Sequence, residues 1–266
     1  MKYEVGSASF IGTRAEQQDS MLVAERDGQL LAAVCDGMGG LTGGSLASAT
    51  AVQRLKQLFE WKPPEVDFPE FYLQAVDILD ESVWNLRKKM EVPRGIGTTM
   101  VSAAVDGGKL YWFNVGDSRM YIVRDQQIVR TTTDHNYFFL LDQALRNGEI
   151  TDAEYNREAR RGNALVSFIG KGGIEHMDIS PKPLALIPGD RILLVSDGLY
   201  RCVPMGQIRE LAMEEGSAQE IADRLMEKSK QNAPGAQDNQ NLLPGRASMP
   251  QSLHTNFSPA AAAGFS

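Results

Sequence analysis

Isolated aspartates follow short apolar runs at several places in this 266-residue sequence. Asp36 comes directly after LLAAVC, Asp197 directly after RILLVS, and Asp117 directly after WFNVG. A carboxylate at the mouth of a buried strand is costly unless it is paired, and binding a divalent cation is one way to offset that cost. Hard ions such as Mg²⁺ and Mn²⁺ prefer oxygen ligands of this kind. The pattern therefore favours a metal site built from strand ends.

Two further acids stand in comparable positions. Asp19, in TRAEQQDS, begins another apolar stretch, and Asp238, in AQDNQNLL, precedes a short apolar pair. In AVCDGMGG the glycines leave the backbone bare, so that a carbonyl as well as the Asp36 carboxylate can approach an ion. Asp-Gly is also a common tight-turn dipeptide, and each such pair taken alone is better explained by a plain turn. It is the whole set that favours the metal site.

The elements that would position these acids are short strands and two longer helices. Apolar or alternating runs predict strands over 30–35, 98–105, 109–115, 120–124 and 191–196. VDGGKL and VRDQQIV predict hairpin turns, and helical spacing predicts helices over 45–59 and 70–90. Capping boxes at Thr151 and Ser217 predict two further helix starts. Hairpins favour antiparallel sheets, so we expect an α+β fold: a central β-sandwich of two antiparallel sheets flanked by helices on both sides.

Composition and charge restrict the class of protein. A net charge of −7 and 42% apolar residues are typical of a soluble globular protein and argue against nucleic acid or a membrane as partner. The sequence has no apolar run long enough for a membrane span and no signal peptide, so we expect a cytoplasmic protein. Its two cysteines, Cys35 and Cys202, fit a reducing compartment, and Cys35 is expected to be buried rather than nucleophilic.

Several blocks together resemble one known family in their order and spacing. They are TRAEQQD, AVCDGMGG, GTTMVSAAV, FNVGDSRMYIVR, TTDHN, LIPGDRILLVSDGLY and AQDNQNLL. These blocks are similar to those of the metal-dependent, type-2C serine/threonine protein phosphatases, in their compact bacterial form. The resemblance implies a single catalytic domain over 1–243, with a flap region at about 133–173.

The resemblance also implies roles for the acids. Asp36 matches an acid that bridges two metal ions, and the carbonyl of Gly37 matches a ligand of the second ion. Asp197 and Asp238 match the remaining carboxylate ligands of the first ion, and Asp19 matches an acid that holds metal-bound water. Two core Mn²⁺ or Mg²⁺ ions are therefore the expected cofactors.

Asp117 matches a ligand of a third, weaker ion, and Arg14 matches the arginine that binds the substrate phosphate. In such enzymes a water bridging two ions attacks the phosphorus of phosphoserine or phosphothreonine, while the arginine binds phosphoryl oxygens. Arg14, Asp36 and Asp197 are therefore the expected catalytic residues. The expected partners are phosphorylated proteins and a cognate serine/threonine kinase, and the expected state is a monomer.

Two positions depart from the family pattern. Gln18 stands where many members have glutamate, and its amide adds no negative charge for a metal. Met38 stands where animal members have a histidine that could act as general acid, and no other residue can be assigned that role. His135 and His176 are at different places in the sequence and are expected to have ordinary loop or surface roles.

The flap region is polar and helical, with an exposed-looking pair, Phe138 and Phe139. It is compatible with a solvated helical excursion or with substrate contact beside the metals. For substrate contact, the candidates that could meet an acidic phosphoprotein are Arg157, Arg160 and Arg161.

The C-terminal end of the chain also departs from the family pattern. Leu242 and Leu243 are followed by Pro244, which cannot donate to a strand ladder, so we expect a truncated or atypical C-terminal strand. Residues 244–266 contain a single Lys or Arg, several prolines and no periodic apolar face, which predicts a disordered tail. An alternative function therefore stays open, namely a catalytically weak or inactive regulatory or binding module with the same fold. Retention of the acids and of Arg14 favours the enzyme.

Overall fold

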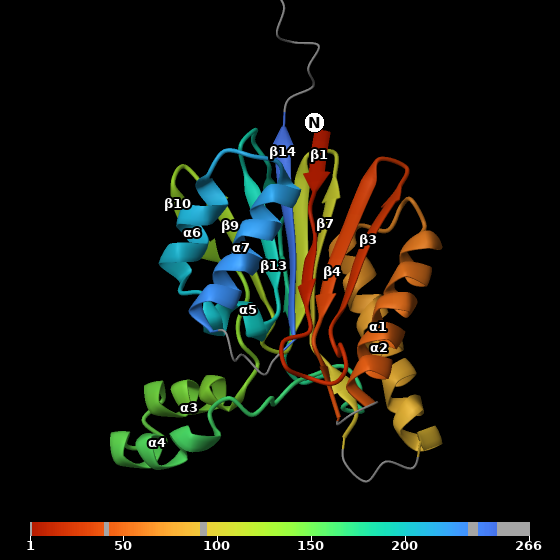
Figure 1. The fold of residues 1–266 in the computed structure, drawn as a ribbon. Coiled ribbons are helices and arrows are strands. Elements are labelled where there is room, and N and C mark those ends of the chain that lie inside the picture. The colour runs from red at the N-terminus through yellow and green to blue at the C-terminus, as the bar shows by residue number, and fades with distance from the viewer. Residues whose placement is uncertain (1, 40–42, 91–94, 234–238, 249–266) are drawn as a thin grey trace, which may run out of the picture.

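The protein is built of four layers, in the order helices, sheet, sheet, helices (Figure 1). This computed structural model describes residues 2–39, 43–90, 95–233 and 239–248. One pair of helices, α1 (Gly43–Glu60) and α2 (Phe68–Met90), covers the outer face of one sheet. The other sheet is covered by α5 (Asp197–Cys202), α6 (Met205–Met213) and α7 (Ala218–Asn232). The layers confirm the expected sandwich flanked by helices. In the described part of the chain, no helix combines the length and apolar character needed to cross a membrane.

Both large sheets are antiparallel. One has the order β1 (Lys2–Val5), β14 (Gln240–Ser248), β13 (Arg191–Val195), β9 (Arg119–Arg124), β10 (Gln127–Arg130), with β2 (Ala8–Phe10) also beside β14. The other has the order β11 (Asp178–Ile179), β8 (Lys109–Val115), β7 (Met100–Asp106), β4 (Gln29–Cys35), β3 (Ser20–Arg26), with β12 (Leu184–Ala185) also beside β8. A short separate pair consists of β5 (Gly37–Met38) and β6 (Gly97–Thr98). The predicted hairpins form between β7 and β8 and between β9 and β10.

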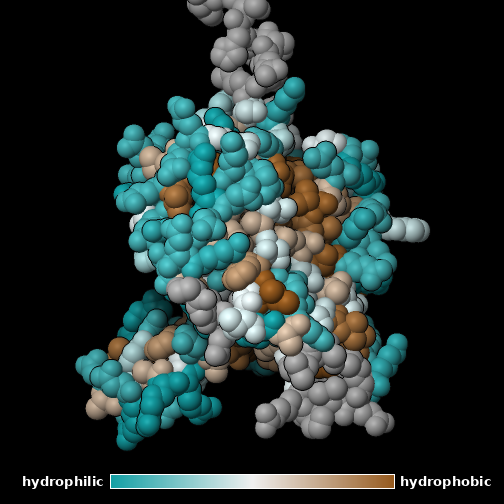
Figure 2. All heavy atoms as spheres, viewed as in Figure 1, coloured by the Kyte–Doolittle hydropathy of each residue, from teal (hydrophilic) through white to brown (hydrophobic). Residues whose placement is uncertain are grey.

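Strand β4 shows why the central strands are almost continuously apolar. Leu31 and Ala33 belong to the core under α1 and α2, whereas Leu30 and Val34 belong to the core between the two sheets. Because both faces of the strand are covered, both sets of alternating side chains are apolar. Cys35 is fully buried, and this burial raises the pKa of its thiol, as expected for a cysteine that is not a nucleophile. Figure 2 shows apolar surface between β1 and β3, at the edge where the two sheets face each other.

The antiparallel pairing brings the predicted acids to one end of the sandwich. The last residue of β4 lies opposite the first residue of β3, so Asp36 and Asp19 flank the same strand pair. Strand β8 ends shortly before Asp117 and β13 ends shortly before Asp197, and the loop after β8 leads directly into β9, the neighbour of β13. Acids that are far apart in the sequence therefore converge because of strand direction.

Strand β14 corrects the expectation of a truncated C-terminal strand. It has nine residues, ends at Ser248 and lies between β1 and β13. The carbonyl of Pro244 accepts a hydrogen bond from Gly6 N–H at 2.9 Å, at the point where the neighbour of β14 changes from β2 to β1. The N and C=O of a strand residue face the same edge, so the donor that proline lacks falls in this break between two partners. Residues 244–248 thus belong to the sheet, and residues 249–266 lie outside the described residues.

The flap region projects beyond one end of the sandwich as α3 (Tyr137–Arg146), α4 (Asp152–Glu158) and a 3₁₀ turn, Ala159–Arg161 (Figure 1). Both predicted capping boxes form, at the starts of α4 and α7. The aromatic pair is half-buried rather than exposed, which corrects the expectation from sequence. The Phe138 ring lies 6.3 Å from that of Tyr155, and the Phe139 ring lies 5.1 Å from that of His176. These contacts fix α3 against α4 and against the body of the protein.

Candidate active site

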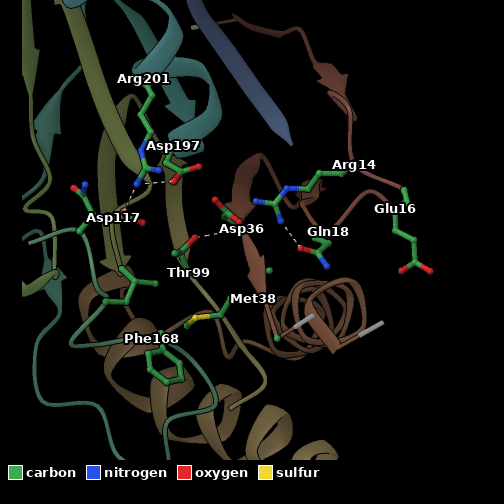
Figure 3. Close-up of a pocket in the computed structure, with 15 residues that line it drawn as sticks. Arg14, Glu16, Gln18, Asp36, Met38, Thr99, Asp117, Phe168, Asp197 and Arg201 are labelled. Atoms are coloured by element: carbon green, nitrogen blue, oxygen red, sulfur yellow. Dashed lines mark hydrogen bonds and ion pairs between the residues drawn. The ribbon is translucent and has the colours of Figure 1, made fainter. Parts of the chain in front are cut away.

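An open cavity of about 640 Å³ lies where the acids converge (Figure 3). The charged and amide side chains in its wall are Arg14, Glu16, Gln18, Asp36, Asp117, Asn163, Asp197 and Arg201. Leu165 and Phe168, at the end of the flap region, form an apolar part of the wall. The structure therefore brings together most of the site residues expected from sequence. Asp238, the remaining expected carboxylate ligand, lies outside the described residues.

The backbone of Asp36 is held by two threonines of the β6–β7 segment. Its N–H donates to Thr99 Oγ1 at 3.0 Å, and its carbonyl accepts from Thr99 N–H and from Thr98 Oγ1, both at 2.9 Å. Thr99 Oγ1 also lies 2.7 Å from Ser118 Oγ, beside Asp117. This network fixes the backbone at both acids. These threonines were not among the predicted site residues, although they stand in GTTMVSAAV, one of the blocks that carry the family resemblance.

Burial and neighbouring charges raise the pKa values of Asp36 and Asp117. Burial raises the pKa of Asp36 well above its usual range, and the charges of Asp19 and Asp197 raise it further. Burial and the charge of Asp197 raise the pKa of Asp117 to about 7, although Arg201 opposes this shift. Carboxylates in such proximity repel each other when all are ionised, and a bound cation relieves that repulsion.

The donor set suits a hard divalent ion, because the converging groups are carboxylates. Asp197 Oδ1 is buried and accepts no hydrogen bond from the described residues, so an acceptor is left available inside the site. Among the described residues, no three His, Cys, Asp or Glu side chains are close enough together to enclose an ion by themselves. The fit therefore depends on Asp238 and on backbone oxygens in addition to the acids that line the cavity.

Gly37 has a packing reason to be glycine. Its N–H donates to the Gln18 carbonyl at 3.2 Å, and a Cβ at this position would collide with the carbonyl oxygen of Gly44 at the start of α1. The sequence predicts that the glycines around Asp36 leave room for an ion to approach the backbone. At Gly37 the space is occupied by the backbone of α1, and the role of its carbonyl as a metal ligand stays a prediction.

Asp19 lies behind the cavity and is almost fully buried. Ser196 Oγ donates to Asp19 Oδ2 at 2.8 Å and itself accepts a hydrogen bond from Asn241 N–H at 2.9 Å. Ser196 thus joins the start of β3, the end of β13 and β14. Ser196 was not predicted as a site residue, and its place directly before Asp197 is the signal that could have identified it.

Asn239 holds the loop that carries Arg14. Its Oδ1 accepts from Gln18 N–H at 2.7 Å, and its Nδ2 donates to the carbonyls of Ile11 and Glu16 at 2.9 and 3.3 Å. A single side chain next to Asp238 therefore shapes the whole segment between β2 and β3. This role of Asn239 was not predicted from the sequence.

Two arginines approach the acids from different sides (Figure 3). Arg14 Nη1 donates to Gln18 Oε1 at 2.8 Å, and the guanidinium is directed towards Asp36. Arg201, on α5, places Nη2 2.9 Å from Asp197 Oδ2. Arg201 was not predicted, and its spacing of four residues from Asp197 on a helix was the available signal.

The sequence matches the family model described as Protein phosphatase 2C over residues 8–242. The chain belongs to the protein phosphatase 2C family. It is 31% identical over 224 residues to the serine/threonine phosphatase stp of Listeria monocytogenes, an overlap that covers 82% of this chain and 84% of that protein. The family expected from the sequence is therefore confirmed.

Solved structures of phosphatases share the fold. The PPM Ser-Thr phosphatase MsPP from Mycobacterium smegmatis, in complex with cacodylate, is 30% identical with a TM-score of 0.72, covering 91% of this chain and 97% of that one. The catalytic domain of the serine/threonine protein phosphatase PstP, in complex with two manganese ions, is 26% identical with a TM-score of 0.75, covering 93% and 99%.

The other residues singled out from the sequence of this protein phosphatase 2C member include one that lines the cavity. Met38 lines the cavity, whereas His135 is buried and accepts a hydrogen bond from Gly116 N–H through Nδ1 at 3.2 Å, which supports the loop before Asp117. A second cavity of about 750 Å³ adjoins the first, and the flap contributes Arg146 to it. Arg157, Arg160 and Arg161 are exposed on the flap, and their role in substrate contact stays a prediction.

Proposed function

We propose that this chain is a metal-dependent phosphatase that hydrolyses phosphoserine and phosphothreonine in proteins, with Mn²⁺ or Mg²⁺ as cofactor. The observation that carries the proposal is the convergence of Asp36, Asp117 and Asp197 with Arg14 in one open cavity. Four charged groups of this kind, held by separate elements, can bind cations on one side and a phosphate group on the other. Membership of the protein phosphatase 2C family supports the same reaction.

In this proposal Asp36, Asp197 and Asp238, with the carbonyl of Gly37, hold two core ions. Asp117 is a further ligand at the edge of the centre, and Asp19 adds negative charge from behind Asp36. When bound, the ions supply Lewis acidity and an activated water as nucleophile. The raised pKa values of Asp36 and Asp117 support this assignment, because they indicate clustered acids whose charge a bound cation would offset.

The side chains of the protein bind and orient the substrate. Arg14 lies at the rim of the cavity, where its planar guanidinium can bind two phosphoryl oxygens at once. The hydrogen bond to Gln18 holds that guanidinium in place. Leu165 and Phe168 form an apolar part of the cavity wall. The phosphate is thereby directed towards Asp36 and Asp197.

The alternative function, a regulatory module that binds no metal, was based on the expectation of a truncated C-terminal strand. Strand β14 instead runs to Ser248, and Asn239, directly before it, accepts a hydrogen bond from Gln18 N–H. The argument for the alternative therefore no longer applies. We also propose that a single catalytic domain includes β14, that the enzyme is a cytoplasmic monomer, and that it opposes a serine/threonine kinase. Free cysteines Cys35 and Cys202 and the bacterial phosphatases among its relatives support this setting.

Hydrolysis of a phosphothreonine peptide tests the proposal. The purified protein should release phosphate with Mn²⁺ or Mg²⁺, should lose this activity in EDTA and should recover it when the metal is returned. A phosphotyrosine peptide of the same sequence serves as the matched control and should react much more slowly. Release that persists in EDTA, or no release at saturating Mn²⁺, would contradict the proposed function.

A further inference from the structure

A guanidinium lies among the buried acids of the active site. Arg201 Nη2 is 2.9 Å from Asp197 Oδ2 and 3.8 Å from Asp117 Oδ2. The two carboxylates are nearly buried, with 11% and 7% of their side-chain surface exposed, whereas the arginine is 44% exposed. The arginine therefore reaches from the rim into the site, and its positive charge meets both acids at the place where they line the cavity (Figure 3).

The neighbours of Arg201 hold it in this position. It stands one helical turn after Asp197, so that the two side chains share one face of α5. The preceding residue, Tyr200, donates from its hydroxyl to the carbonyl of Asp117 at 3.0 Å. The guanidinium of Arg119 lies 3.5 Å from the centre of the Tyr200 ring and is itself held by two hydrogen bonds to Asp134. Tyr200 thus fixes helix α5 to Asp117 and Arg119 beside the acids.

We propose that Arg201 is a tethered cation that competes with divalent metal for the carboxylates of Asp117 and Asp197. Without metal, its charge offsets part of the repulsion among the acids. When metal binds, ion and guanidinium seek the same carboxylate oxygens, and two positive charges at this separation repel each other. Arg201 thereby lowers the metal affinity of the site and stabilises the metal-free protein. The proposal rests on the proposed metal site, of which it names a built-in competitor.

Direct measurement of Mn²⁺ binding tests the competition. In isothermal titration calorimetry, Arg201→Gln should lower the dissociation constant of the weakest Mn²⁺ about tenfold, a coupling usual for groups in direct contact. Arg201→Lys keeps the charge and should stay near the wild type. Arg146→Gln is the matched control, because it removes the same charge from the adjoining cavity, where Arg146 donates to the Asp142 carbonyl at 3.0 Å. Equal changes in the two Gln variants, or no change in Arg201→Gln, would overturn the inference.

Thermal stability supplies a second readout that does not depend on activity. In EDTA, Arg201→Gln should lower the melting temperature. This decrease should be smaller in an Asp117→Asn background, because one of the carboxylates that pair with Arg201 is then absent. In saturating Mn²⁺ the same variant should melt at or above the wild-type temperature. The same loss in both conditions would show a merely structural role and would overturn the inference.

The outcomes also separate this inference from the proposed function. If the wild-type protein binds no Mn²⁺ in calorimetry, the proposed function fails and the inference fails with it. If the wild type binds Mn²⁺ and Arg201→Gln binds it with the same affinity, only the inference fails. A tighter Mn²⁺ site in Arg201→Gln, together with lower stability in EDTA, supports both.

Discussion

Two buried acidic groups in this phosphatase meet the cost of burial in different ways. Asp80, on α2, accepts hydrogen bonds from the backbone N–H groups of residues 170–173, at 2.6–3.4 Å. Asp36 instead faces Asp19 and Asp197, whose charges raise its pKa. Asp80 is therefore satisfied by the fold itself, whereas the acids of the cavity are balanced when a cation joins them. This difference separates an acid that stabilises the structure from acids that carry the chemistry.

The loop around Asp80 shows how backbone N–H groups can balance a buried carboxylate without a metal ion. Gly170, Gly172 and Gly173 have φ values of 98°, 88° and 140°, which non-glycine residues rarely adopt. These conformations turn successive N–H groups towards one carboxylate, as in other anion-binding turns. The loop directly follows the flap segment that contains Phe168 in the cavity wall. Asp80 thus supports the active site only through the position of that segment.

The largest effect on activity is expected when an acid of the cavity is replaced. Asp36→Asn should lower kcat/KM for a phosphothreonine peptide by about 10³-fold or more, because it removes a charge that the ions require. The metal-free variant should melt at a higher temperature than the wild type, since a mutually repelling charge is lost. Asp197→Asn should lose activity equally but gain less stability, because Asp197 pairs with Arg201. Wild-type turnover in either variant at saturating Mn²⁺ would contradict the metal assignment.

The opposite behaviour is expected at Asp80. Asp80→Ala leaves buried N–H groups without their acceptor and should lower the free energy of unfolding by about 3 kcal/mol. For a chain of this size that loss corresponds to a melting temperature about 6–12 °C lower. Well below that temperature, kcat/KM should change only severalfold.

Asp77→Ala is the control for this experiment, because Asp77 is exposed on the same helix. It should leave both the melting temperature and kcat/KM near those of the wild type. Loss of Mn²⁺-dependent activity in Asp80→Ala with an unchanged melting temperature would contradict the structural role of Asp80.

The sequence allowed the cavity acids to be predicted but not Asp80, and the reason is physical. Asp36 and Asp197 each follow an apolar strand, and that local pattern is visible in the sequence. The partners of Asp80 lie about 90 positions further along the chain, and no local pattern connects them. The full length of β14 could not be predicted for the same reason. Pro244 is tolerated in this strand only because two separate strands, β1 and β2, meet beside it. The central strands were predictable, since burial on both faces leaves a continuous apolar run.

A smaller effect is expected at Arg14, which binds phosphate rather than metal in the proposed site. Arg14→Ala should raise KM for the phosphopeptide about tenfold, because an interaction with phosphate made in both ground and transition states acts as uniform binding. Mn²⁺ affinity, measured by calorimetry, should stay within about twofold, since no metal ligand is removed. Arg14→Lys should be intermediate, because an ammonium group cannot bind two oxygens in the same fork.

Arg209→Ala is the control for Arg14, since it removes an exposed arginine from α6, on the outer face of the other sheet. It should leave KM unchanged. An unchanged KM in folded Arg14→Ala would show that Arg14 has no part in binding phosphate.

The smallest effect is expected at Gln18, whose side chain orients Arg14. Gln18→Ala removes the 2.8 Å hydrogen bond to Arg14 Nη1 and should raise KM about threefold, because the guanidinium is then less restricted. The loop itself should persist, since Asn239 holds the Gln18 N–H and Gly37 N–H donates to the Gln18 carbonyl. In an Arg14→Ala background, Gln18→Ala should have no further effect on KM, and Gln18→Glu should restore normal binding in the presence of Arg14. Additive effects of the two alanine substitutions would mean that Gln18 acts on the substrate or the metals independently of Arg14.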